Sequence, residues 1–270
     1  MNYFTHEYVS KRIIRIIDVL KTAAYLIIGD KKACLIDTCN GLGNLKEYVE
    51  TLTQLPYDVV LTHGHFDHAG AASLFQEVYM NPKDIEVYHA YINHPLKQQT
   101  FKTLPKEITD TANKPKANAF LPLHDQQIFD LGNISVEMIE VLGHTPGMMM
   151  ALIPEEKVIL FGDACGESVL IFDDFSSSIS EYRNSLFRIK NEYSMKYDKV
   201  LRNHGTFTSD VDILDNVIEC CNDILAHTDD HYPLKDPLSK NCYAARKVNK
   251  HNLRIDGKHG NVVYRIDKVK

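Results

Sequence analysis

Short apolar runs alternate with amphipathic stretches along most of this 270-residue chain. Apolar runs bounded by turn residues predict strands, and apolar residues repeated at three- and four-residue spacing predict helices. The alternation favours layered packing of helices against sheets. The predicted strands cover residues 13–19, 25–28, 34–36, 58–61, 78–80, 86–88, 127–130, 134–141, 148–153, 157–161, 199–201 and 261–266.

Helices are predicted over residues 42–55 and 69–75, and from two longer apolar stripes further along the chain. Ser209 and Asp212 precede the second stripe and resemble a capping box, which would mark the start of that helix. The two stripes consist of Tyr182, Leu186, Ile189 and Tyr193, and of Val211, Leu214, Ile218, Cys221 and Leu225.

Residues 90–123 differ from the rest, because they contain four prolines, scattered Lys and Thr, and no clear period. A loop of this length within a compact domain is usually functional, so we expect an insertion over the functional site, with room for one short helix. Its five lysines outnumber its two acidic residues between 97 and 118, which is typical of a solvated loop; steering of an anionic substrate is the alternative. We see no linker and no repeat, so residues 1–270 are expected to form one domain.

Composition narrows the function classes. Hydrophobic residues make up 44% and charged residues 24%, which are globular values, and the net charge of −6 gives no reason to expect nucleic acid or an anionic membrane as partner. No apolar run reaches the roughly 18 residues of a membrane span, and Lys11, Arg12 and Arg15 interrupt the first apolar stretch, unlike a signal peptide. Six cysteines without metal-finger spacing suggest reduced thiols and a cytoplasmic location.

One cluster of polar residues directly follows the predicted strand 58–61. It reads H-x-H-x-D-H, and three further candidate ligands each follow another predicted strand. Loops that leave strand ends can meet at one sheet edge, where five imidazoles and two carboxylates would hold two divalent metals, zinc first, with manganese or iron also suitable. The candidate ligands are His63, His65, Asp67, His68, His144, Asp163 and His204.

These motifs resemble the metallo-β-lactamase fold superfamily. The resemblance rests on the H-x-H-x-D-H loop, Gly143-His144-Thr145-Pro146-Gly147, Phe161-Gly162-Asp163 and Asn203-His204-Gly205, and it spans about residues 26–205. It implies an α+β fold, a four-layer αββα sandwich with two sheets face to face. It also implies a first metal on His63, His65 and His144, a second on Asp67, His68 and His204, and a bridging Asp163.

Three details place the chain within that superfamily. Lactamases proper lack an aspartate at the bridging position, so Asp163 indicates the glyoxalase-like or general hydrolase branch and not a true β-lactamase. Glyoxalase-like members usually continue the T-P-G motif with His or Ser, whereas Met148 follows here. Lactonases carry a Tyr just after the bridging Asp, whereas Ala164 and Cys165 follow it here.

The expected function is a dinuclear metal-dependent hydrolase, in which a metal-bridging hydroxide attacks an ester, thioester or phosphoester bond of a small molecule. Asp67 would orient that hydroxide and pass on its proton. Two divalent cations, two carboxylates and a hydroxide leave a net charge of +1, which suits an anionic substrate. The alternative is a mononuclear iron oxygenase of the persulfide dioxygenase type. A metal-dependent nuclease is a further alternative, but this chain lacks the basic surface expected of a nuclease. A binding protein without turnover is the remaining class.

Several other residues have simpler interpretations than a functional one. Cys165 is expected to be a small buried residue, with a further metal ligand or redox-sensitive group as the alternative. His227, Asp229, Asp230 and His231 are expected in a solvated turn. The aromatic residues after Asp163, namely Phe172, Phe175 and Tyr182, would either line a substrate pocket or pack against the next helix.

Overall fold

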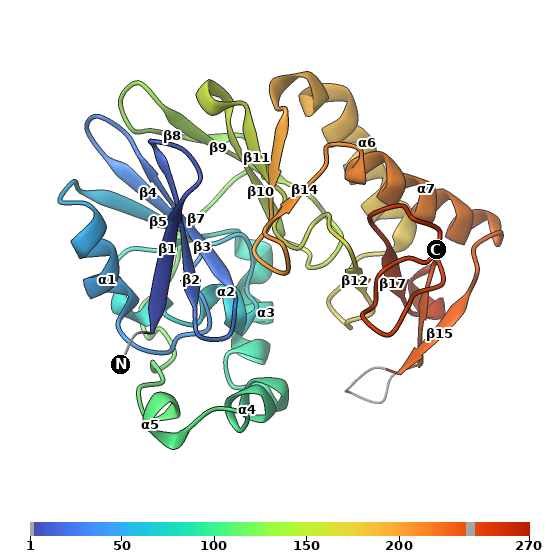
Figure 1. Cartoon of the computed structure of the whole chain (residues 1–270), viewed down its shortest axis with the longest axis horizontal. Coiled ribbons are helices and arrows are strands. Elements are labelled where there is room, and N and C mark those ends of the chain that lie inside the picture. Colours follow the sequence, from blue (N-terminus) through green and yellow to red (C-terminus); the bar gives the residue numbers. More distant parts are fainter. Residues whose placement is uncertain (1–2, 236–240) are drawn as a thin grey trace.

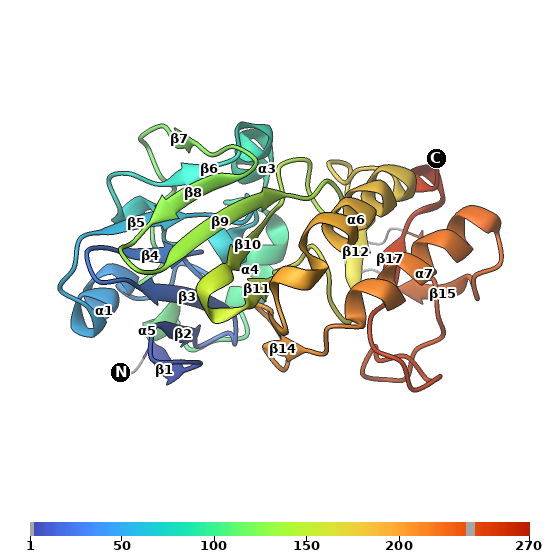
Figure 2. The same cartoon turned by 90° about the horizontal axis from the view of Figure 1, so that it is seen from above.

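Two large β-sheets pack face to face, with helices on both outer faces, in a computed structural model that describes residues 3–235 and 241–270 (Figures 1 and 2). The predicted α+β fold and αββα layering are therefore confirmed. No helix in this described part of the chain is both long and apolar enough to cross a bilayer.

The first sheet has seven strands in sequence order, antiparallel from β1 to β4 and parallel from β4 to β7. Tyr25 pairs with Ile36, and Ile36 pairs in turn with Val60, which fixes the register of the central strands. The strands are β1 (Phe4–Tyr8), β2 (Ile13–Asp18), β3 (Ala23–Ile28), β4 (Ala33–Ile36), β5 (Tyr57–Val60), β6 (Tyr79–Met80) and β7 (Leu121–Pro122).

The second sheet has six strands in the order β14-β13-β11-β10-β9-β8, all antiparallel except the β11–β13 pair. The parallel pair brings the ends of β11 and β13 to the same edge. The strands are β8 (Gln127–Asp130), β9 (Ser135–Glu140), β10 (Met149–Ile153), β11 (Val158–Leu160), β13 (Lys199–Leu201) and β14 (Thr208–Ser209).

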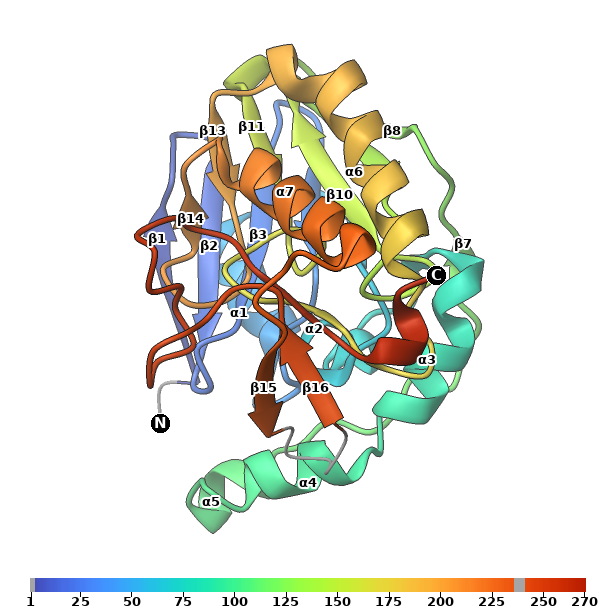
Figure 3. The ribbon, with the colours of Figure 1, turned by 90° about the vertical axis from the view of Figure 1, so that its right-hand side faces the viewer.

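The core is divided into layers by the alternation of side chains along the strands. One apolar cluster joins the facing sides of the two sheets and includes Tyr25 and Ile27 on β3 and Met138 on β9. The outer face of the first sheet packs against α1 (Leu45–Leu52) and α3 (Ile85–Tyr91). The outer face of the second packs against α6 (Ile179–Tyr193) and α7 (Ile213–Ala226), which lie side by side in Figure 3.

The two long helices show how far sequence patterns define an element. The stripe that predicted α6 is entirely buried, and Ser178 caps the helix in a capping box with Glu181. The predicted capping box of α7 is wrong, because Ser209 belongs to β14 and the N-cap Asp212 makes no side-chain cap hydrogen bond. Val211 lies before the helix and is 47% exposed.

Two shorter predictions also fail. Residues 86–88 are not a strand, because Asn81 caps a turn of 3₁₀ helix that begins with Pro82, and the chain continues from this turn directly into α3. The helix predicted over 69–75 begins earlier, as α2 (Phe66–Ala69), followed by a 3₁₀ turn. The 3₁₀ turns cover Ala72–Leu74, Pro82–Asp84, Pro154–Glu156, Ser194–Lys196 and Ile266–Lys268.

The segment 90–123 contains two short helices, α4 (Pro95–Phe101) and α5 (Lys106–Thr109), and ends in β7. Its positive charge is smaller at the surface than the sequence suggested, because two lysines are buried. The Nζ atom of Lys97 donates to the Ile92 carbonyl, and that of Lys116 donates to the Phe75 and Gln76 carbonyls. These two lysines therefore stabilise the fold of this segment through hydrogen bonds to backbone carbonyls.

A third, smaller sheet lies to one side of the two large sheets, near the C-terminus of the chain (Figure 1). Its strand order is β12-β17-β16-β15, and sequence patterns predicted only β17. The other strands are short, and Pro233 interrupts the apolar pattern of β15, as is typical of an edge strand. The strands are β12 (Val169–Ile171), β15 (Tyr232–Lys235), β16 (Asn241–Ala244) and β17 (Val262–Tyr264).

Candidate metal centre

The seven candidate ligands lie on four loops, each of which leaves the C-terminal end of a strand. The first four follow β5 of the first sheet, and His144, Asp163 and His204 follow β9, β11 and β13 of the second sheet. The convergence expected from the sequence is thus present in the fold. It places donors from both sheets at one end of the sandwich.

Ligand atoms of these residues form three overlapping groups, and within each group all of them lie within 4.8 Å of one another. One group is His63, His65 and His144. A second is Asp67, His68 and His204, and the third is His63, His68 and Asp163. The overlap through His63 and His68 makes a single continuous cluster of donors.

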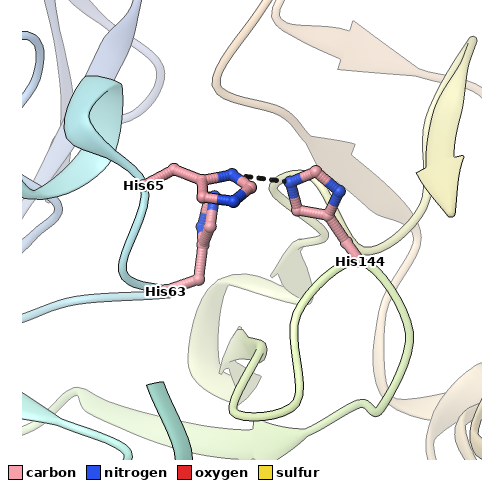
Figure 4. A group of neighbouring side chains, drawn as sticks. All are labelled: His63, His65 and His144. Atoms are coloured by element: carbon pink, nitrogen blue, oxygen red, sulfur yellow. Dashed lines mark hydrogen bonds between the residues drawn. The ribbon is translucent and has the colours of Figure 1, made fainter. Parts of the chain in front are cut away.

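The three imidazoles of the first group point toward one another (Figure 4). Nε2 of His144 lies 3.0 Å from Nδ1 of His65. Nε2 of His63 is buried without a hydrogen-bond partner among the described residues. Buried polar atoms are normally satisfied, so this orphan nitrogen fits a site that receives a cation.

The second group is more open. Nε2 of His68 lies 3.1 Å from Nε2 of His204, and an Asp67 oxygen lies 3.5 Å from the same His204 atom. The Asp67 side chain is 27% exposed. This half of the cluster therefore borders space that a small molecule can reach.

Asp163 lies between the two halves. One carboxylate oxygen is 3.6 Å from Nε2 of His68 and 3.8 Å from Nε2 of His144, and the other is 3.5 Å from Nε2 of His204. Burial opposes ionisation, but His204, His68 and His144 together hold the pKa of Asp163 well below its usual range. Asp163 is therefore a carboxylate with histidines on both sides.

Burial also favours the neutral form of the inner histidines, His63 and His65. It holds the pKa of His63 and of His65 well below the usual value, and neighbouring imidazoles add to the effect. Burial acts in the same direction on His68, but Asp163, Asp37 and Asp67 outweigh it and raise its pKa. Neutral imidazoles at His63 and His65 offer the lone pairs that metal ligation requires.

Asp37 is a supporting residue that the sequence analysis missed. Its buried carboxylate accepts hydrogen bonds from the Thr62 backbone, 2.7 Å, from Nδ1 of His68, 2.9 Å, and from the Asn203 side chain, 2.9 Å. The bond from Nδ1 turns Nε2 of His68 toward the cluster. The available signal was a carboxylate directly after the strand at 34–36, at the same sheet edge.

Asp84 is the second missed residue, and it ties two ligand loops together. It accepts hydrogen bonds from the Gly64 backbone at 2.8 Å, the Thr145 hydroxyl at 2.8 Å and the Gly147 backbone at 2.5 Å. A Cβ at position 64 would lie only 2.7 Å from the Tyr88 backbone nitrogen, so glycine permits this close approach. Burial raises the pKa of Asp84 to about 6.

The remaining candidates lie outside the cluster. None of the potential metal groups found among the described residues includes Cys165 or the His227–His231 segment. Cys165 is buried, and burial raises the pKa of its thiol, so it matches the simpler interpretation of a small core residue. Tyr182 lies on the buried face of α6 and packs in the core, whereas Phe172 lines a cavity beside the cluster.

An αββα sandwich with a histidine–aspartate cluster at one end defines a class of metal-binding proteins. The chain belongs to the metallo-beta-lactamase superfamily, whose family model matches residues 17–193. The prediction of a metal-dependent hydrolase of this fold is confirmed at the level of the family. The fold and the clustered donors imply divalent metal binding.

Individual relatives agree with this assignment. The chain is 25% identical over 189 residues to the hydroxyacylglutathione hydrolase GloC of Haemophilus influenzae, covering 67% of this chain and 83% of that protein. It is 32% identical over 191 residues to a probable metallo-hydrolase of Methanocaldococcus jannaschii, covering 67% and 86%. A metallo-beta-lactamase structure from Pontibacter korlensis shares the fold with a TM-score of 0.60 at 15% identity, covering 81% of this chain and 99% of that one.

Proposed function

We propose that this chain is a dinuclear metal-dependent hydrolase that cleaves an ester, thioester or phosphoester bond of a small molecule. The observation that carries the proposal is the gathering of seven donor side chains from four loops into three overlapping groups. The hydrolase relatives support it.

The ligand assignment follows the grouping of donor atoms. His63, His65 and His144 would hold the first ion, and Asp67, His68 and His204 the second. Asp163 would serve both, since its oxygens approach His144 on one side and His68 and His204 on the other. Five imidazoles and two carboxylates suit zinc best, and manganese or ferrous iron also fits this donor set.

When bound, the two ions would supply a water of lowered pKa as the nucleophile and a Lewis acid for the bond to be cleaved. The protein contributes fixed donors, since Asp37 orients His68 and the Leu170 carbonyl accepts a hydrogen bond of 2.9 Å from Nδ1 of His144. Asp67 is partly exposed at the border between the cluster and the cavity, where its carboxylate can orient the attacking water and accept its proton.

Metal analysis combined with a substrate panel tests this function. The purified protein should contain two divalent ions per chain and should hydrolyse at least one member of a panel of esters, thioesters, lactones and phosphodiesters. Chelation should abolish turnover, and zinc should restore it. One iron per chain with oxygen uptake would instead establish the mononuclear oxygenase. No hydrolysis of any substrate by the metal-loaded protein would indicate a binding role.

A further inference from the structure

A cavity of about 330 Å³ opens directly on the metal centre. One end is formed by candidate ligands, His65, Asp67, His144 and Asp163. The volume is at the small end of the range for small-molecule pockets. Because ligands form its floor, whatever occupies the cavity lies beside the reacting bond.

One wall of the cavity is formed by α2, by the end of α3 and by the start of α4. Phe66 on α2, Tyr91 on α3 and Leu96 on α4 belong to one apolar cluster and line the cavity. The Tyr91 ring lies with its centroid 4.1 Å from that of His65. The apolar wall therefore begins at the metal centre itself.

The opposite wall is the third sheet. Val169 and Ile171 on β12 point into the core beneath α6 and α7, so Leu170 between them faces the other way and lines the cavity. Leu170 pairs with Val263 on β17, which lines the cavity as well. Leu170 is 37% exposed, so its side chain is accessible to an occupant of the cavity.

Leu170 connects this wall to the ligands. Its carbonyl accepts the hydrogen bond from Nδ1 of His144, so the strand that orients a ligand also presents an apolar side chain to the cavity. β15, β16 and β17 follow residue 193, the end of the match to the family model. This part of the wall therefore lies beyond the residues that the family model matches.

Away from the metal centre, the charges of the lining disfavour an anionic occupant. None of the described residues that line the cavity is Lys or Arg, and Asp173 is a carboxylate. A phosphate or carboxylate group placed against Leu170 and Val263 would lose hydration without gaining a cation. An uncharged apolar group loses nothing there and gains burial.

We propose that this cavity binds the apolar acyl chain of a carboxylic ester or thioester, and that the third sheet selects for chain length. This inference rests on the proposed hydrolase function and narrows it. The oxygen of water bonds to the acyl carbon, the carbon–sulfur or carbon–oxygen bond breaks with its electron pair leaving on the heteroatom, and the proton from water passes to that leaving group. The charged or polar leaving group points out of the cavity.

Chain-length dependence of hydrolysis tests the proposal. The metal-loaded enzyme is assayed with acetyl, butanoyl, hexanoyl and octanoyl thioesters of N-acetylcysteamine, which carries no charge. We expect kcat/KM to rise with length, by up to about fourfold per methylene group, until the cavity is filled. Leu170→Phe should lower the ratio of kcat/KM for the octanoyl thioester to kcat/KM for the acetyl thioester at least tenfold. Leu170→Ala should move the optimum to longer chains.

Ile128→Phe is the matched control, because Ile128 is an apolar strand residue on β8, 63% exposed and absent from the cavity lining. It should keep the wild-type profile. Hydrolysis that is independent of chain length, or equal in Leu170→Phe and wild type, would overturn the acyl pocket and leave the hydrolase function standing.

Binding of 2-decanone, which cannot be hydrolysed, gives a second readout by isothermal titration calorimetry. Saturable binding that Leu170→Phe weakens at least tenfold, in a protein that hydrolyses no thioester, would contradict the proposed function while supporting an apolar-ligand pocket. Absence of both binding and chain-length dependence would overturn the pocket. A wild-type circular dichroism spectrum for Leu170→Phe confirms that the variant is folded.

Discussion

Three imidazoles of the metal centre each engage Nδ1 in a local interaction. Nδ1 of His63 lies 3.1 Å from the Thr62 hydroxyl, that of His68 donates to Asp37, and that of His144 donates to the Leu170 carbonyl. Such contacts fix the tautomer and turn Nε2 toward the centre. The ring orientations are therefore set by the protein before any ion binds.

Asp163→Ala removes the carboxylate between the two halves of the cluster. We expect metal content to fall below two ions per chain and activity to fall at least about a hundredfold, because in the proposed centre Asp163 would be shared by both ions and no neighbouring side chain could replace it. Elemental analysis and kcat/KM measure the two effects. Asp198→Ala, at an exposed position away from the cluster, is the control. Two retained ions with full activity would rule out the bridging role.

Asp84 gives a prediction about pH and stability. Burial raises its pKa from 3.8 to about 6, so the folded protein binds its proton more tightly than the unfolded chain does. The contribution of Asp84 to the free energy of unfolding therefore decreases as pH rises from about 4 to 6, by roughly 3 kcal/mol in all.

Comparison of wild type with Asp84→Asn isolates this effect, since asparagine does not titrate. Urea denaturation at several pH values should show the stability difference, wild type minus variant, falling over that pH window. A difference that stays constant would mean that the three hydrogen bonds to Asp84 keep its pKa near 3.8, and a difference that rises would mean that they lower the pKa further.

The ligands and the residues that support them differ in how well sequence predicts them. Four candidate ligands share a compact motif, and the other three each follow a predicted strand, so their convergence could be expected. Asp37 and Asp84 are single carboxylates, 26 and 21 residues from His63, with no motif of their own. Their role depends on which backbone groups the folded loops bring to them, and no local pattern records that.

Among the elements, the best-predicted ones carry their own boundary signals. α6 has a full apolar stripe and the Ser178–Glu181 capping box. Residues 86–88 of α3 were predicted to be a strand, because a run of three residues fits the helical and the strand period equally well. Only the capped turn at Asn81–Pro82 favours the helix. Three strands of the third sheet were missed because they have only three or four residues, and because β12 pairs with β17 from a distant part of the chain.

Ser178→Ala tests the capping of α6. Loss of the side-chain bond to the Glu181 backbone, 3.3 Å, should lower the free energy of unfolding by about 1 kcal/mol. Thermal or urea denaturation measures the change. Ser185→Ala, the same substitution inside the helix, should be neutral or slightly stabilising, since alanine has the higher helix propensity. Equal changes in the free energy of unfolding for the two variants would mean that the Ser178 cap makes no specific contribution to stability.

At the scale of the whole molecule, the two facing sheets were predicted from the resemblance to the metallo-β-lactamase fold superfamily and not from the periodicity of apolar residues. Alternating strands and helices indicate α/β layering, but they do not say that the strands divide into two facing sheets. That division depends on pairings such as β4 with β5 and β11 with β13, which join residues separated by intervening helices. Such long-range pairing leaves no trace in a local window.

The charge distribution predicts a weak effect of salt on turnover. Of the five lysines between 97 and 118, Lys97 and Lys116 are buried and Lys106 pairs with Asp110. Little positive charge therefore remains to attract an anionic substrate. We expect kcat/KM for such a substrate to change less than about threefold between roughly 0.05 and 0.5 M salt, with a neutral ester as control. A tenfold decrease restricted to the anionic substrate would restore the steering hypothesis.

The origin of the donors in both sheets has a mechanical consequence. His63 to His68 are attached to the first sheet, and His144, Asp163 and His204 to the second. Ions bound by residues of both sheets would cross-link the two halves of the sandwich. Each cross-link would close a loop of the polypeptide that is far longer than any single loop of the fold. The heat resistance of the protein would then be set by the free metal concentration around it, as well as by its apolar core.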